Sequence, residues 1–139
     1  MSKRSVNLIS GSACLLTGGM LYVLFRPNTI VAKLFSGFPF VKNLQIWFAS
    51  VSCDLFRYYF TDFLWGYSLT CGLSAILSDS CRNAFISGIC GFLCGVIWEL
   101  LQFAGIVPGT GDFWDIGLYF CGSALSVILN IRREQNEKN

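Results

Sequence analysis

The chain has 139 residues, of which 54% are hydrophobic and 13% are charged, and its mean hydropathy is +0.58. Soluble domains typically carry about 25% charged residues, so this composition predicts an integral membrane protein, and the length leaves space for about four spanning helices. A net charge of +2 without a continuous basic run argues against a nucleic-acid partner, and the lack of histidine excludes Ser-His-Asp triads and the commonest ligands of zinc and iron.

The first apolar stretch, residues 7–25, carries no charged side chain and follows Lys3 and Arg4. It is long for the core of a signal peptide, and no small-x-small cleavage site ends it, so it predicts a membrane span. Pro27 follows closely and is expected to stop the helix.

Residues 28–59 mix apolar, aromatic and charged side chains, and no uncharged run among them reaches spanning length. Many aromatic rings in such a segment are typical of the membrane interface, where a ring lies half buried. Leu44, Trp47 and Phe48 follow helical spacing, which predicts an amphipathic helix. A turn is expected before that helix, at residues 37–39.

Three further apolar runs predict the remaining spans, at about 60–78, 83–107 and 113–131. The linkers between them are short and contain turn-forming residues, so neighbouring helices are expected to be antiparallel. The sequence thus predicts an all-α integral membrane protein, a single domain over residues 1–139 with four transmembrane helices in a compact bundle and an interfacial amphipathic segment between the first and second spans.

The basic residues predict the orientation of these spans. Six of them lie on the side of the two termini and four lie on the other side, which favours cytoplasmic termini and a multi-pass protein of the cell membrane. The six are Lys3, Arg4, Arg82, Arg132, Arg133 and Lys138.

The seven cysteines include no CxxC pair, and five of them lie inside apolar runs. These five are expected to be small buried hydrophobic residues rather than disulfide partners or metal ligands. They are Cys14, Cys71, Cys90, Cys94 and Cys121. The sequence predicts neither a metal centre nor a cofactor.

Three acidic residues are predicted to lie at one depth in the membrane. Asp62, Glu99 and Asp115 each lie 16 residues from the cytoplasmic end of their span, which is about 24 Å at 1.5 Å per residue. Within a hydrocarbon core of about 30 Å, all three would lie just beneath the outer surface. We therefore expect a layer of carboxylates at the outer end of the bundle.

Two stripes of residues predict which helix faces point into the bundle. Residues that recur at intervals of three or four share one face, and glycines on that face permit close helix contact. The third span carries Gly88, Gly91, Gly95, Glu99 and Gln102 in this spacing. The last span carries Asp112, Asp115, Tyr119, Gly122 and Ser126. Glu99 should therefore point into the bundle, and a carboxylate inside a span marks a functional site by default.

Structural alternatives are open for the neighbours of Glu99. Asp112 follows a glycine-rich turn and suits a helix N-cap, with Asp115 in the first turn, where the helix dipole favours an acid. An interfacial ion pair with Arg57 is an alternative for Asp62. Gln102 suits a hydrogen bond between helices as well as a binding site.

Two stretches resemble the VanZ-like family of small multi-spanning bacterial membrane proteins. Residues 98–122 have the sequence WELLQFAGIVPGTGDFWDIGLYFCG. The family carries E-x-x-Q near the outer end of one helix, then a loop, and then D-x-x-D at the start of the last helix, with glycine further along. The matching positions are Glu99, Gln102, Asp112, Asp115 and Gly122. Residues 59–69, YFTDFLWGYSL, are similar to the segment that opens the preceding helix, where short relatives carry Asp before Leu-Trp.

The resemblance covers about half of the chain and implies a bacterial membrane protein. One branch of the family is associated with lowered susceptibility to teicoplanin-type lipoglycopeptides. That branch has Asn where this chain has Tyr119, so Tyr119 is not carried over as a site residue. We expect an outward-facing pocket that engages an envelope lipid or a lipid-linked, amphiphilic glycopeptide-type compound, with acids binding polar or cationic groups and aromatic rings taking apolar chains. The predicted lining is Asp62, Glu99, Gln102, Asp112 and Asp115.

Two other functions fit the same sequence. One is a membrane-embedded enzyme that modifies a lipid head group, with Glu99 and Asp115 as general acid and base, because one clustered carboxylate can stay protonated while its neighbour is ionised. The other is an accessory subunit, or a homo- or hetero-oligomer, that docks through its glycine-rich helix faces. A divalent cation is an alternative ligand for the acids.

Overall fold

The computed structural model describes residues 2–25, 34–35, 37–51, 59–77 and 80–138. These residues form five helices and no strand, which confirms the all-α fold for this part of the chain. The helices are α1 (Lys3–Phe25), α3 (Pro39–Val51), α5 (Phe60–Ile76), α6 (Cys81–Phe103) and α7 (Phe113–Lys138).

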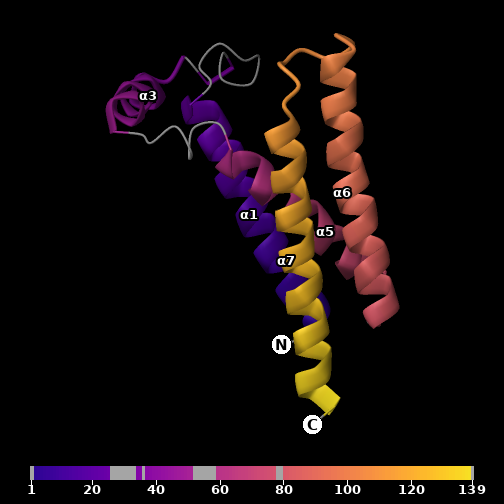
Figure 1. Ribbon diagram of the computed structural model, residues 1–139. Coiled ribbons are helices and arrows are strands. Elements are labelled where there is room, and N and C mark those ends of the chain that lie inside the picture. The colour runs from indigo at the N-terminus through magenta and orange to yellow at the C-terminus, as the bar shows by residue number, and fades with distance from the viewer. Residues whose placement is uncertain (1, 26–33, 36, 52–58, 78–79, 139) are drawn as a thin grey trace.

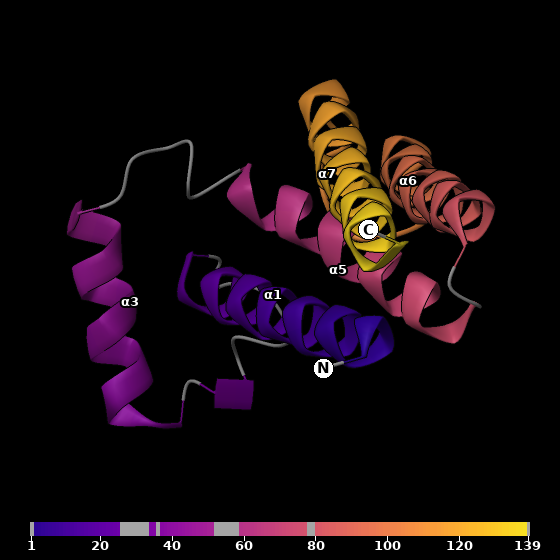
Figure 2. The same cartoon turned by 90° about the horizontal axis from the view of Figure 1, so that it is seen from below.

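Four of the helices pack into a bundle in which α5 occupies the centre. α5 contacts α1, α6 and α7, and it lies between α1 and the α6–α7 pair (Figure 2). Both termini lie at one end of the bundle, and the connection from α6 to α7 lies at the other (Figure 1). We call these the terminal end, with the start of α1 and the end of α7, and the loop end, with the end of α6 and the start of α7.

Three helices are long and apolar enough to cross a membrane, namely α1, α6 and residues Phe113–Asn136 of α7. They indicate a multi-pass membrane protein. The fourth predicted span, 60–78, corresponds to α5, which has 17 residues. A helix of that length extends about 26 Å, less than the roughly 30 Å of the hydrocarbon core. Three of the four predicted spans thus have the length and composition that crossing requires.

The outer bounds of α1 and α7 extend beyond the predicted spans. The first helix begins at Lys3 rather than at residue 7, and the last continues to Lys138 rather than ending at residue 131. Hydropathy identifies only the part of a helix that is embedded in lipid. Backbone hydrogen bonding continues into polar flanking residues, because these residues are compatible with helical dihedral angles.

α6 is displaced toward the N-terminus relative to its predicted range of 83–107. Its N-cap is Ser80, whose side chain accepts a hydrogen bond from the Asn83 backbone N–H at 3.2 Å, so the helix begins at Cys81. It ends at Phe103, two residues before Gly105, whose φ of +68° is left-handed. Glycine adopts this conformation without steric cost and commonly follows the end of a helix.

α3 confirms the helix predicted in the aromatic segment, and it begins at Pro39, the last residue of the predicted turn. The Gln45 side chain donates to the Val23 carbonyl of α1 at 2.9 Å, and the Phe48 and Phe25 rings meet edge to face with centroids 5.4 Å apart. These contacts hold α3 beside the loop end of α1 (Figure 1). Residues 28–33, 36 and 52–58 of the predicted interfacial segment lie outside the described residues.

Small residues let the helix backbones approach closely. A Cβ added to Gly122 of α7 would collide with the Phe63 carbonyl oxygen of α5, and one added to Gly95 of α6 would collide with the Tyr119 ring. The two predicted stripes therefore face the bundle interior, as their spacing indicates. Their buried members are Gly88, Gly91, Gly95 and Glu99 on α6, and Asp115, Tyr119, Gly122 and Ser126 on α7.

Six of the seven cysteines lie within the described residues, and no disulfide joins any two of these six. Cys71 is buried, as predicted, and Cys14 is half-buried. Cys90, Cys94 and Cys121 are exposed, so the predicted burial is wrong for these three. Lipid and protein interior are both apolar, so an apolar run does not reveal which of its residues face the bundle.

Candidate functional site

Three carboxylates and one tyrosine come together at the loop end. We call Asp62, Glu99, Asp115 and Tyr119 the carboxylate cluster. Asp62 lies in the first turn of α5, Asp115 lies in the first turn of α7, and Glu99 lies one turn before the end of α6. Because α5 and α7 begin where α6 ends, antiparallel packing brings the three acids to the same end of the bundle (Figure 1).

Glu99 is the most buried acid of the cluster, with 2% of its surface exposed. This burial confirms that it points into the bundle. Its Oε2 accepts a hydrogen bond from the Asp112 backbone N–H at 3.1 Å, which links the end of α6 to the residue that precedes α7. Negative charge is favoured at a helix N-terminus, so Glu99 also helps to hold the start of α7.

Tyr119 connects the three helices that carry the acids. Its hydroxyl donates a hydrogen bond to Asp62 Oδ1 at 3.1 Å, and its ring packs against Gly95 of α6. The sequence placed Tyr119 on the inward face of the last span but did not predict it as a site residue. Its position four residues after Asp115, on the same helix face, was the available signal.

Asp62, Glu99 and Asp115 all lie near the Tyr119 hydroxyl. Asp115 is 9% exposed, and Asp62 is half-buried. Ionisable groups are costly within a membrane and are mostly found there at functional sites. An ionised carboxylate is only an acceptor of hydrogen bonds, so the cluster is suited to cations and to groups with several hydroxyls.

Asp112 has the capping role that the sequence allowed for it. Its Oδ1 accepts a hydrogen bond from the Trp114 backbone N–H at 3.0 Å, and α7 begins at the next residue, Phe113. This is the usual geometry of an N-cap aspartate. Its side chain therefore helps to start α7, and its predicted part in ligand binding stays a prediction.

Gln102 holds the loop between α6 and α7. With its amide oriented to satisfy both polar atoms, Nε2 donates to the Thr110 carbonyl at 3.2 Å, and Oε1 accepts from the Trp98 indole N–H at 2.8 Å. A Cβ added to Gly109, whose φ is +145°, would lie 2.7 Å from this amide. Glycine at this position lets the loop close over Gln102. One of these bonds goes to the loop and the other stays within α6. Neither reaches a neighbouring helix, so the alternative role of Gln102 as a hydrogen bond between helices is wrong.

The sequence also suggests two cationic partners for the acids, a divalent metal ion and the Arg57 side chain. Among the residues that the structure describes, no group of three or more Cys, Asp or Glu side chains is arranged to hold a metal ion. The ion pair expected as an alternative for Asp62 involves Arg57, which lies outside the described residues.

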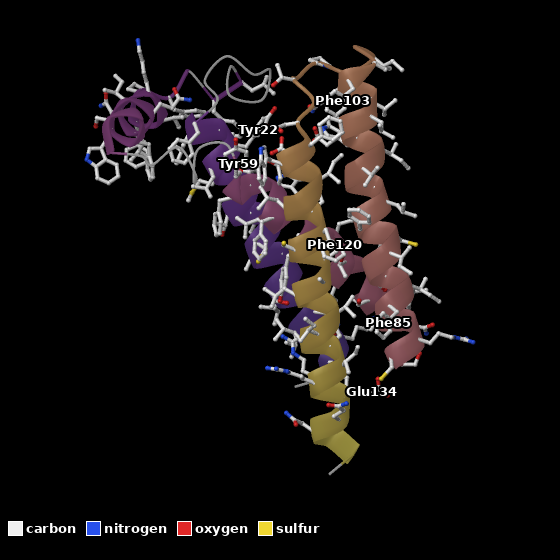
Figure 3. The ribbon with its side chains drawn as sticks, in the orientation of Figure 1. Tyr22, Tyr59, Phe85, Phe103, Phe120 and Glu134 are labelled. Carbon is white, nitrogen blue, oxygen red and sulfur yellow. The ribbon has the colours of Figure 1, made fainter. Side chains whose placement is uncertain are left out.

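A second polar cluster, which the sequence did not predict, lies at the terminal end. Asn7 of α1 is 1% exposed, donates to Asn130 Oδ1 at 2.6 Å and accepts a hydrogen bond from the Arg133 guanidinium at 2.7 Å. We call Asn7, Asn130 and Arg133 the amide network. Beside it, the Cys81 thiol donates to Glu134 Oε2 at 3.0 Å and joins α6 to α7; Figure 3 shows Glu134 near this end.

No protein-family model, curated protein or solved structure matches the chain.

Proposed function

We propose that this chain is a bacterial membrane protein of the VanZ-like kind, in which the carboxylate cluster engages the polar or cationic part of an envelope lipid or of an amphiphilic glycopeptide-type compound. The observation that carries this proposal is the convergence of acids from three helices at the loop end, with Glu99 and Asp115 buried. A bundle of apolar helices gains no packing from three carboxylates, so their placement favours a role in binding.

The surroundings of the cluster support an amphiphilic ligand. Phe103, Ile106, Phe113 and Trp114 are exposed at the loop end, and the Phe103 and Phe113 rings lie 4.9 Å apart. Figure 3 shows Phe103 at this end of α6. Acids beneath exposed apolar side chains would receive a ligand that carries a polar or cationic group next to an alkyl or aromatic group.

The path of the chain supports a fourth crossing by α5. α1 runs from the terminal end to the loop end, and α6 begins again at the terminal end (Figure 1). α5 returns the chain between them, and its 17 residues lie at the lower limit of known spanning helices. Four crossings would leave both termini on one side of the membrane.

The distribution of basic residues supports cytoplasmic termini and an outward-facing carboxylate cluster. Lys3, Arg4, Arg82 and Arg132 all lie at the terminal end of their helices. Positive charges accumulate on the cytoplasmic side of membrane proteins. The loop end would then face the outer leaflet, where envelope lipids and glycopeptides are met.

A membrane-embedded enzyme is the second candidate, because the buried acids Glu99 and Asp115 both lie near the Tyr119 hydroxyl. Neighbouring carboxylates in one site can divide the roles of general acid and general base. In this alternative they would act on the head group of an outer-leaflet lipid.

The test is the teicoplanin susceptibility of a Gram-positive host that produces the protein. Glu99→Gln and Asp115→Asn remove single charges from the cluster, and Glu134→Gln is the matched control at the terminal end. We expect protection with the native chain and with the control, and loss of protection with both cluster variants at equal abundance in the membrane. Equal susceptibility of all strains, with or without the protein, would contradict the proposal.

The lipid profile of the same strains separates the two candidates. A binding protein leaves lipid composition unchanged, whereas an enzyme produces a modified lipid that disappears in Glu99→Gln and persists in Glu134→Gln. An accessory subunit would behave differently again, because it would tolerate both acid substitutions.

A further inference from the structure

An apolar groove of about 300 Å³ runs between α6 and α7 in the half of the bundle nearer the terminal end. Its α6 wall includes Phe85, Ile89 and Phe92, and its α7 wall includes Phe120, Ala124 and Ile128. The Phe92 and Phe120 rings meet edge to face with centroids 5.7 Å apart at the inner limit of the groove. Figure 3 shows Phe120 beside α6 and Phe85 near the start of that helix.

Two arginines lie where the groove reaches the terminal end. Arg82 precedes Phe85 by three residues, and Arg132 follows Ile128 by four, so each shares a helix face with a wall of the groove. Both arginines are exposed. The adjacent Arg133 is instead half-buried, and its guanidinium donates a hydrogen bond to the buried Asn7 at 2.7 Å.

The length of the groove fits one membrane leaflet. On α7 its lining extends from Phe120 to Ile131, which is about 16 Å along a helix. Half of a hydrocarbon core of about 30 Å is about 15 Å. A single acyl chain that starts at the terminal end would therefore lie along the groove up to the Phe92–Phe120 contact.

We propose that this groove binds one acyl chain of an anionic phospholipid from the leaflet at the terminal end, with the lipid phosphate held between Arg82 and Arg132. Apolar walls accept any acyl chain, whereas the two arginines supply the preference for an anionic head group, since each basic side chain near a membrane surface contributes about 1 kcal/mol of attraction, a factor of about five. The site lies at the opposite end from the carboxylate cluster and does not rest on the function proposed for that cluster.

Native mass spectrometry of the purified full-length protein in detergent tests this site. Dioleoyl-phosphatidylglycerol and dioleoyl-phosphatidylcholine carry the same chains but differ in net charge, and the bound fraction of each is measured by titration. We expect tighter binding of phosphatidylglycerol, by about fivefold for each arginine. The Arg82→Gln/Arg132→Gln double variant should lose this preference and still bind both lipids weakly. Arg4→Gln, an exposed arginine of α1 at the same end, should keep it.

A second pair of variants tests the groove itself. Ala124 is half-buried in the groove wall, so Ala124→Phe should fill the space and weaken the binding of both lipids. Cys121→Phe adds the same ring at an exposed position outside the lining and should bind like the native chain. Equal affinities of the two lipids for the native chain would overturn the proposal. So would a preference that survives in the double arginine variant, or a lipid-free dimer, which would assign the groove to a second copy of the chain.

Discussion

The two ends of the bundle both bury polar side chains, but the partners of these side chains differ. At the terminal end, Asn7 uses both atoms of its amide, one toward Asn130 and one toward Arg133. At the loop end, Glu99 accepts from a backbone N–H and Asp62 accepts from a phenol hydroxyl. The terminal end thus pairs donor side chains with acceptor side chains from two helices, whereas the loop end gathers acceptors from three.

This difference separates two reasons for placing polar groups in a membrane. An amide carries a donor and an acceptor, so an amide network satisfies itself and fixes the relative positions of its helices. A group of carboxylates is complemented by a cation or by a group that brings several donors. We therefore expect substitutions at the terminal end to change stability, and substitutions at the loop end to change function more than stability.

Gly122→Leu is expected to have the largest effect, because both ends depend on the close packing of α5 and α7 between them. The new side chain would be driven against the Phe63 carbonyl oxygen, a backbone atom that cannot rotate away. We expect a loss of about 3 kcal/mol or more of unfolding free energy, seen as aggregation or as a large drop in the thermal midpoint in detergent.

The matched control is Gly117→Leu, five residues earlier on α7, where nothing lies within 4 Å of an added Cβ. This variant should keep the native midpoint. If Gly122→Leu were as stable as Gly117→Leu, the two helices would not be held together at this contact, and the geometry of the Asp62–Tyr119 pair would not be fixed by it.

The packing faces could be predicted because they follow from helix periodicity alone. Glycines at intervals of three or four identify the inward face of α6 whatever its neighbours are, so the spacing by itself places Glu99 in the interior. The capping role of Asp112 was accessible for a similar reason, since an aspartate just before a helix has few other local partners.

The amide network could not be predicted, because its members are distant in sequence. Asn7 and Asn130 are separated by 123 residues, and their pairing depends on how α1 and α7 meet in space. Within its own apolar stretch, Asn7 looks like an isolated polar residue. Tyr119 was missed for a different reason. Its position on the inward face was known, but its partner Asp62 lies on another helix, so periodicity within one helix could not reveal the hydrogen bond.

Asn7→Ala is expected to have the next largest effect and tests the structural interpretation of the terminal end. The substitution removes the acceptor of the Arg133 guanidinium and the donor to Asn130. A hydrogen bond to a charged group contributes roughly 1.5–3 kcal/mol, so we expect a loss of about 2 kcal/mol in unfolding free energy, measured in mixed detergent micelles.

Asn136→Ala serves as the control, because Asn136 is exposed on α7 at the same end. It should change the unfolding free energy by less than about 0.5 kcal/mol. Teicoplanin protection by Asn7→Ala, compared at equal membrane abundance, should match that of the native chain. A loss of protection at equal abundance would show that the terminal end also contributes to function, and the contrast between the two ends would fail.

The smallest expected effect is the stability change in Glu99→Gln, and it addresses the strongest structural explanation for the loop end. Glu99 accepts the Asp112 backbone N–H, so its burial is compatible with a purely structural role at the start of α7. Gln keeps a carbonyl oxygen that can accept this bond, whereas Ala leaves the N–H of the half-buried Asp112 without this partner, at a cost of about 1–3 kcal/mol. We expect Glu99→Ala to unfold earlier in detergent, and Glu99→Gln to differ from the native chain by less than about 1 kcal/mol in unfolding free energy.

If both variants nevertheless lose protection equally, the carboxylate acts through its charge rather than through its bond to α7. If Glu99→Gln is instead as unstable as Glu99→Ala and its protection falls only as far as its abundance, the charge of Glu99 serves to hold α7, and the binding role would rest on Asp62 and Asp115 alone.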